Sequence, residues 1–247
     1  MFKSISDLTG LDILRASFTL VFVIISFLVG LRILLKYFTL KRKELITVGL
    51  SWIFLSSPWW PLAISFITIL LFNYLLDPWF YVFLMNGFAA PGLFCWIYSV
   101  SELNFPQLKK KLIVIFGIIC GVYEAILLVL FGLNYELIAA QGVNFDGFNY
   151  SRSIFVMIFL IFFIVTAFVS AILFCRASLQ SENETVRWKG KFLLLGFITF
   201  VAAAAIDVFS FGNKILQAIL RIALSIAAIL YYLGFFLPSW LEKYLIK

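Results

Sequence analysis

Residues 153–175 read SIFVMIFLIFFIVTAFVSAILFC, 23 consecutive residues without a charged side chain. A helix of this length rises about 35 Å, enough to cross the ~30 Å hydrocarbon core of a bilayer. The whole chain of 247 residues has a similar composition: 64% of its residues are hydrophobic, 13% are charged, and the mean hydropathy is +1.10. Soluble domains average about 25% charged residues. The composition therefore excludes a soluble domain and predicts a protein that crosses the membrane several times.

Seven apolar runs are long enough to span a bilayer. They lie at about residues 13–37, 45–72, 79–101, 112–134, 153–175, 191–210 and 215–238. The only long connection is at about 135–152, and no stretch remains for a separate soluble domain. The sequence predicts an all-α membrane protein: one seven-helix transmembrane domain over residues 1–247, in the plasma membrane.

Charge alternates between successive loops. The loops after the first, third and fifth predicted spans are basic, whereas the N-terminal stretch and the loops after the second and fourth spans are weakly acidic. The positive-inside rule then places the N-terminus outside and the C-terminus in the cytoplasm. An even number of spans would break this alternation. The net charge of +7 thus indicates topology and contact with anionic lipids of the bilayer, and we expect no nucleic acid partner.

The residues that are missing exclude much catalytic chemistry. The chain contains no histidine, which removes Ser-His and Cys-His catalysis and the common zinc and haem sites. Its three cysteines, Cys95, Cys120 and Cys175, lie in apolar runs without CxxC spacing and are expected to be small buried hydrophobes. We therefore expect no enzymatic activity, no metal and no cofactor.

Two of the predicted spans contain proline. Residues 56–61 read SSPWWP in the middle of the second span, where Pro58 and Pro61 predict a kink. This kink is either static, with Trp59 and Trp60 packed against neighbouring helices, or a hinge whose aromatic side chains form the wall of a pocket. The third span contains Pro91, and the run Ala202–Ala205 in the sixth span permits close approach of a neighbouring helix.

Four charged residues lie where a bilayer tolerates charge poorly: Arg15, Glu124, Asp207 and Arg221. Counting 1.5 Å per residue from the basic loops places all four in the outer half of the membrane. Asp207 and Arg221 flank a short turn at similar heights, so they form an ion pair if their helix faces match. Such charges either fix helix register as a buried salt bridge, or line a polar cavity open to the outside, or form an ion or proton path.

A polar cavity would have a defined set of candidate ligand-binding residues. They are Glu124, Asp207, Arg221, Arg15, Asn86, Tyr123, Trp59 and Trp60, with Asn73, Asp77 and Asn134 at the rim. Arg32 is different, because it lies one turn from Lys36 near the inner end of the first span. We expect its side chain to extend to the cytoplasmic interface.

The order of basic loops and spans along the chain resembles that of a known class of membrane protein. A basic Lys41-Arg42-Lys43 follows the first span, Lys109–Lys111 follow the third, and the sequence RWKGK at 187–191 leads into the sixth. Over about residues 10–240 this layout resembles the seven-transmembrane sensor region of prokaryotic membrane histidine kinases. Those proteins continue into a dimerisation helix and a kinase, whereas this chain ends at Lys247. The resemblance therefore implies the receptor part alone, with its output passing to a separate cytoplasmic partner.

Three functions follow as hypotheses. The first is a stand-alone receptor-like sensor that binds a small ligand from outside and signals through a cytoplasmic protein. The basic residues expected to dock that protein are Lys41, Arg42, Lys43, Lys109, Lys110, Lys111, Arg187 and Lys189. The second is a small secondary transporter or proton-coupled carrier in which Glu124 carries the proton. The third is an intramembrane lipid enzyme, for which Glu124 and Asp207 are the available carboxylate pair.

Overall fold

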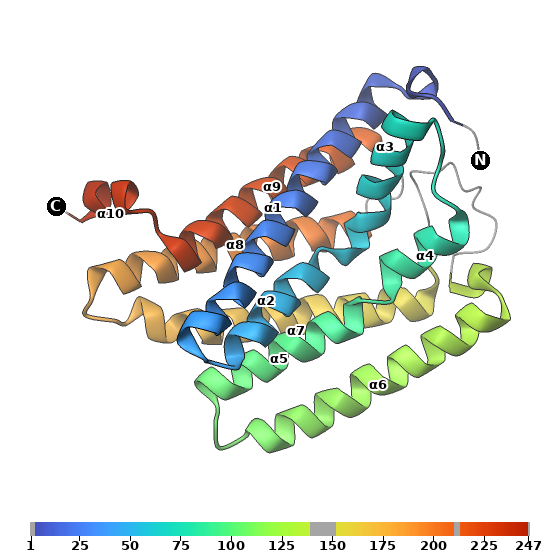
Figure 1. Cartoon of the computed structure of the whole chain (residues 1–247). Helices are drawn as coiled ribbons and strands as arrows, with labels where there is room; N and C mark the ends of the chain where they lie inside the picture. The colour runs from blue at the N-terminus through green and yellow to red at the C-terminus, as the bar shows by residue number, and fades with distance from the viewer. Residues whose placement is uncertain (1–2, 139–151, 210–212, 247) are drawn as a thin grey trace.

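The computed structural model describes residues 3–138, 152–209 and 213–246, and these parts of the chain form a bundle of helices (Figure 1). Seven helices are long and apolar enough to cross a membrane, as the sequence predicts. They are α1 (Gly10–Leu40), α2–η2–α3 (Glu44–Leu55, Ser57–Trp59 and Trp60–Phe72), α4–α5 (Pro78–Asn86 and Ala89–Asn104), α6 (Lys109–Leu133), α7 (Ile154–Leu179), α8 (Glu184–Val208) and α9 (Lys214–Phe236). Three short helices complete the described fold: η1 (Ile5–Asp7), η3 (Tyr135–Ile138) and α10 (Ser239–Leu245).

Helix caps explain where the spans begin. Thr9 and Asp12 form a capping box, so α1 starts at Gly10, earlier than its apolar run. The sixth span begins at Glu184 and not near 191, because the Asn183 side chain accepts a hydrogen bond from the amide of Val186. Residues 139–151 of the connection expected at about 135–152 lie outside the described residues.

The two ends of the bundle differ in charge. The amino-terminal end, near the N-terminus, holds the starts of α1, α4, α7 and α9, and the α10 end holds the starts of α2, α6 and α8 (Figure 1). The basic loops around residues 41–43, 105–111 and 180–191 all lie at the α10 end. Successive antiparallel spans therefore produce the separation of charge that the alternating loops predict.

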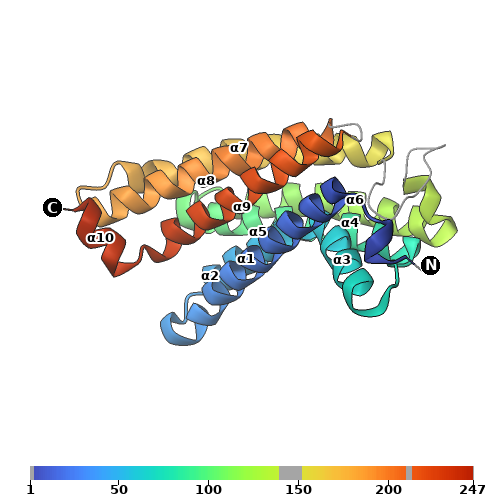
Figure 2. The ribbon, with the colours of Figure 1, turned by 90° about the horizontal axis from the view of Figure 1, so that it is seen from above.

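Packing gives the helices unequal roles. The α8–α9 pair makes the most extensive contact, α1 packs on α2 and α9, and α5 packs on α2, α6 and α7. The α6 helix lies at the edge of the bundle and packs mainly on α5 (Figures 1 and 2). Charged groups on α8, α9 and α1 are thus placed to meet one another, whereas α6 has fewer partners.

Aromatic side chains form the centre of the core. The ring of Trp52 on α2 stacks on Tyr231 of α9, with ring centroids 3.4 Å apart. The indole of Trp96 on α5 donates a hydrogen bond to the hydroxyl of Ser170 on α7, at 2.8 Å. Phe197 of α8 contacts both Trp96 and Tyr231, with centroid distances of 5.0 and 5.1 Å. This cluster joins α2, α5, α7, α8 and α9.

Small residues allow the closest helix approaches. A Cβ atom added to Gly30 of α1 would lie 2.7 Å from the carbonyl oxygen of Gly49 on α2, and one added to Gly49 would lie 2.6 Å from the Gly30 oxygen. On the α8–α9 interface, a Cβ at Gly196 would lie 3.2 Å from the amide nitrogen of Tyr231. Close backbone approach of this kind drives helix association where the surroundings are as apolar as the helices.

The kink predicted at residues 56–61 is confirmed. The α2 helix ends at Leu55 and the 3₁₀ turn η2 separates it from α3. The hydroxyl of Ser56 donates to the carbonyl of Ile53 at 2.7 Å and accepts from the indole of Trp60 at 2.9 Å. These bonds stabilise the break, because proline removes the regular backbone hydrogen bonds there.

The third span is also broken, at Gly87 and Phe88 between α4 and α5. Pro91 explains the position, because its ring excludes the hydrogen bond to the carbonyl four residues earlier, that of Gly87. Phe88 stacks on Phe54 at 5.5 Å and lies 5.1 Å from the ring of Trp60. The breaks in the second and third spans therefore pack against each other.

The close approach of Gly30 to Gly49 predicts that alanine destabilises the protein at position 30 but not at a glycine with open space around it. Gly30→Ala should lower the free energy of unfolding by about 1–3 kcal/mol, because the new methyl group overlaps the α2 backbone. The control is Gly121→Ala, at a position where an added Cβ meets no atom within 4 Å. It should leave the melting temperature in detergent unchanged or raise it, since alanine favours helix over glycine. Equal effects of the two substitutions would contradict the close approach.

Candidate ligand site

A polar stripe runs along one face of α9. Lys214, Gln217, Arg221 and Ser225 are spaced by three or four residues, so they lie above one another on the helix. Asn213 fixes the start of the helix, since its side chain accepts a hydrogen bond from the amide of Leu216 at 3.0 Å. The stripe faces α1 and α8, because its partners lie on those helices.

The first turns of α1 and α9 are joined by charge. The Asp12 carboxylate lies 3.1 Å from the ammonium group of Lys214 and 3.7 Å from the guanidinium of Arg15. Arg15, only 1% exposed, donates a hydrogen bond to the side chain of Gln217. Arg15 therefore fixes the register of α1 against α9 and satisfies part of its hydrogen-bonding capacity inside the protein.

One turn further along α9, Arg221 pairs with Asp207 of α8 at 3.0 Å. Both side chains are 7% exposed. The predicted ion pair is thus confirmed. The Asp207 carboxylate also accepts a hydrogen bond from the indole of Trp59 at 3.2 Å, and the Arg221 guanidinium lies 5.8 Å from the centre of the Trp59 ring. The break at η2 brings Trp59 into this group.

Arg152 extends the site and was not among the residues predicted from the sequence. It lies just before α7 and lines a narrow pocket together with Asp207, Trp59 and apolar side chains of α2, α7 and α8. The free space in this pocket is about 30 Å³, enough for one or two water molecules. Burial lowers the pKa of Arg152 from its ordinary value, and the nearby Asp207 carboxylate opposes that shift.

Arg152, which lines the pocket, and Arg221, which pairs with the pocket residue Asp207, keep unused hydrogen-bond donors. Nε and Nη1 of Arg221 and Nε of Arg152 are buried and have no acceptor among the described residues. A buried donor left without an acceptor costs about 1–3 kcal/mol, and more when the group is charged. Around Asp207, Arg221 forms the ion pair and Arg152 lines the same pocket, so two arginines face one carboxylate there. The excess of cations and the free donors suit an anionic ligand.

Several predicted site residues lie elsewhere. Trp60 packs against Phe27, Phe54 and Phe88, away from the ion pair. The amide of Asn86 donates to the carbonyl of Val82 in its own helix, at 2.9 Å.

Glu124 and Tyr123 belong to α6, at the edge of the bundle. Tyr123 stacks on Phe159 of α7 with ring centroids 3.6 Å apart, and it is near enough to interact electrostatically with Arg152. Oε2 of Glu124 is buried without a hydrogen-bond partner in the described part of the chain. No hydrogen bond or ion pair between described residues joins Glu124 to Asp207.

The expected rim residues stabilise turns. Asn73 ends α3 in the left-handed conformation, with φ of 49°. The side chain of Asp77 accepts from the amide of Trp79, and that of Asn134 accepts from the amide of Glu136, both at 2.9 Å. Capping accounts for these three polar residues without a ligand.

The residues predicted to dock a partner lie together at the α10 end. Some of them are neutralised locally: Arg42 pairs with Glu44 at 2.9 Å, Arg187 pairs with Glu184 at 2.8 Å, and Lys109 pairs with Glu102. The remaining members of the predicted set form no ion pair with a described acidic residue. They are Lys41, Lys43, Lys110, Lys111 and Lys189.

The described residues contain no candidate metal site, and comparison with known proteins assigns no family. Within residues 3–138, 152–209 and 213–246, no three histidine, cysteine, aspartate or glutamate side chains are placed to hold a metal ion. No model of a known protein family matches the chain, and no curated protein matches it either.

The Arg221–Asp207 pair predicts strong coupling. Asp207→Asn or Arg221→Gln alone should lower the free energy of unfolding by about 3–5 kcal/mol, because each leaves a buried partner uncompensated. The double variant should recover part of this loss, which a double-mutant cycle of unfolding measurements will show. The control pair is Arg42–Glu44, whose side chains are 59% and 19% exposed. The double-mutant cycle of this control pair should give an interaction energy of about 0–1 kcal/mol. If the effects of the Arg221 and Asp207 substitutions on the free energy of unfolding simply add, the pairing is contradicted.

Proposed function

We propose that this chain is a receptor-like sensor that binds a small anionic ligand at the pocket lined by Arg152 and Asp207, beside Arg221, and signals through a separate cytoplasmic protein. The observation that carries the proposal is the set of buried guanidinium donors of Arg221 and Arg152 that have no acceptor among the described residues. Carboxylate and phosphate groups pair with guanidinium more strongly than neutral acceptors do. The resemblance to the sensor regions of histidine kinases supports the same function.

The orientation follows from the basic loops. The α10 end carries the basic loops of the bundle, so by the positive-inside rule it faces the cytoplasm. The amino-terminal end, with the pocket near it, then faces outside, in the plasma membrane. A ligand therefore reaches the site from the extracellular side, and a partner docks on the opposite end.

The geometry suggests how binding would be transmitted. An anion that accepts hydrogen bonds from the unused Nε or Nη1 of Arg221 adds a second negative charge near Asp207. Repulsion between the two anions weakens the link between the end of α8 and the start of α9. The α8 and α9 helices pack closely through small residues. A displacement at one end of this pair would therefore move each helix as a rigid body. At the other end, the hydroxyl of Thr185 on α8 donates to the carboxylate of Glu242 on α10 at 2.6 Å. In this proposal the displacement reaches the α10 end through this contact, close in sequence to Arg187 and Lys189.

Orientation is tested by labelling with a membrane-impermeant maleimide. Ser6→Cys, at the amino-terminal end, should be labelled in intact cells. Lys110→Cys, at the α10 end, should be labelled only after permeabilisation. Both positions are exposed, while Cys120 and Cys175 are buried. The reverse pattern would place the pocket on the cytoplasmic side and contradict the proposal.

Ligand class is tested with the small anions acetate and inorganic phosphate, each compared with chloride at equal ionic strength. At least one of these anions should raise the melting temperature of the purified protein, because binding to the folded state adds up to about 2.7 kcal/mol at 100 times Kd. Arg221→Gln should abolish the shift, and Arg42→Gln, at an exposed pair, should keep it. The proposal fails if no anion stabilises the wild type, or if Arg221→Gln responds as the wild type does.

A second candidate, a small secondary transporter, is favoured by one observation. The second and third spans are both interrupted at proline, and their breaks pack together through Phe54 and Phe88. Interrupted helices often form the substrate sites of transporters. In this alternative Glu124 carries the proton, so uptake into proteoliposomes that is lost in Glu124→Gln would distinguish it from a sensor.

A further inference from the structure

A large groove opens on the outside of the bundle between α1 and α9, and it shares no lining residue with the polar pocket. Its volume is about 520 Å³, within the range of about 300–1,000 Å³ typical of small-molecule sites. The two helices run in the same direction and separate toward the α10 end (Figure 2). The residues that line the groove are Ile25, Leu28, Val29, Leu31, Arg32, Leu35, Ile229 and Tyr232.

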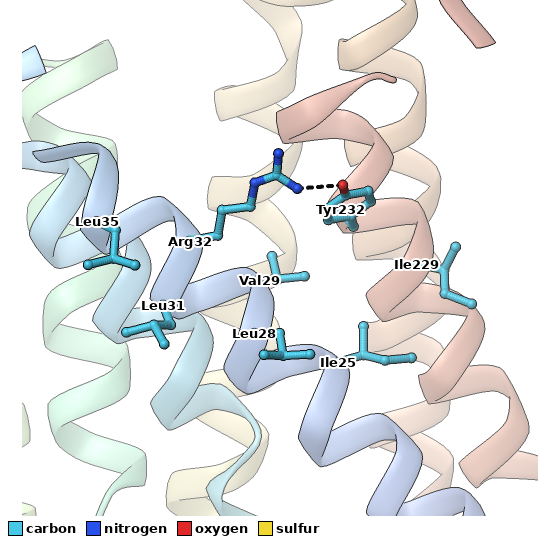
Figure 3. A pocket seen from close by; sticks show the side chains of 8 residues that line it. All are labelled: Ile25, Leu28, Val29, Leu31, Arg32, Leu35, Ile229 and Tyr232. Carbon is cyan, nitrogen blue, oxygen red and sulfur yellow. Dashed lines mark hydrogen bonds between the residues drawn. The ribbon is translucent and has the colours of Figure 1, made fainter. Parts of the chain in front are cut away.

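The groove is apolar along its length and cationic at one end. Six of the eight lining side chains are aliphatic, and Figure 3 shows Arg32 reaching from α1 to Tyr232 on α9. The Arg32 guanidinium donates to the Tyr232 hydroxyl at 2.6 Å and lies 4.5 Å from the centre of the Phe236 ring. These contacts hold the guanidinium across the end of the groove instead of leaving it to move freely in solvent.

Two further cations extend this charge: Lys36 lies near Arg32, and Lys189 lies near Lys36. The ammonium group of Lys36 lies 4.5 Å from the centre of the Phe236 ring, and Lys36 interacts electrostatically with both Arg32 and Lys189. None of these three cations forms an ion pair with an acidic side chain of the described residues. Their mutual repulsion is therefore not compensated within the described part of the protein.

The depth of Arg32 matches that of a lipid head group. The α1 helix has 31 residues and a length of about 46 Å, longer than the ~30 Å hydrocarbon core. Arg32 lies eight residues, or about 12 Å, before the end of α1 at Leu40. The cations thus lie near the boundary between acyl chains and head groups, and the aliphatic part of the groove lies within the acyl region.

We propose that this groove binds one anionic phospholipid, with an acyl chain along the aliphatic residues and the phosphate on Arg32 and Lys36. Charge complementarity selects the ligand, since three uncompensated cations at the mouth of an apolar groove between membrane helices match a negatively charged head group. A zwitterionic lipid offers the same acyl chain but brings its own cation, which the cluster repels.

Native mass spectrometry of the full chain tests the site. The protein is released from nanodiscs that contain equal amounts of phosphatidylglycerol and phosphatidylcholine with identical acyl chains. The wild type should retain one phosphatidylglycerol, at least about fivefold in excess of phosphatidylcholine. Arg32→Gln should reduce the ratio to near one, whereas Arg32→Lys, which keeps the charge, should preserve most of it.

Two controls separate the groove from general surface charge and from loss of folding. Arg42→Gln removes a charge at the same end outside the groove and should keep the wild-type ratio. Leu28→Trp fills the groove and should reduce retention of both lipids while Arg32 is intact, with the wild-type melting temperature maintained. Equal retention of the two lipids by the wild type, the same loss in Arg42→Gln as in Arg32→Gln, or full retention in Leu28→Trp would each overturn the proposal.

Discussion

Much of the amino-terminal half of the bundle depends on the ion pair between Arg221 and Asp207, because neither charge is tolerated in an apolar bundle alone. The pair, at 3.0 Å, joins α9 to α8, and the hydrogen bond from Trp59 to Asp207 joins both to the break in the second span. One turn earlier on α9, Gln217 accepts from Arg15 and ties α1 to the same face. A single polar stripe on α9 therefore sets the register of three neighbouring elements.

Proline and small residues make this arrangement possible. The chain breaks at η2, where the indole of Trp59 contacts Asp207 and the ring of Trp60 contacts an aromatic cluster. A continuous helix would orient these two neighbouring side chains differently. Gly30 and Gly49 let α1 and α2 approach closely, and Gly196 does so for α8 and α9. Close packing makes these helices stiff. The structure thus combines a buried charged layer with closely packed helices, the combination that the proposed sensor requires.

The sequence predicts the seven helices well, because twenty apolar residues in a row have few other stable structures. It also predicts the Asp207–Arg221 pair, since a short turn leaves the two residues at equal depth. It does not predict which of Trp59 and Trp60 reaches the site, because the break changes the rotation of the chain between them. It does not predict Arg152 as a site residue, since nothing local shows that a residue two positions before α7 shares a pocket with Asp207. Glu124 illustrates the opposite case: its depth follows from the sequence, but α6 lies at the edge of the bundle, where helix rotation decides its neighbours.

In the proposed sensor, the guanidinium groups of Arg221 and Arg152 receive an anion from outside the protein. The most direct test is an electron cryo-microscopy map of the chain in a lipid nanodisc, inspected around these two side chains and Asp207. We predict density that is not protein within hydrogen-bond distance of Arg221 or Arg152, continuous with the amino-terminal end of the bundle. A dry, closed cluster in which Asp207 and other side chains occupy every donor would contradict the account and leave the charges with a structural role only.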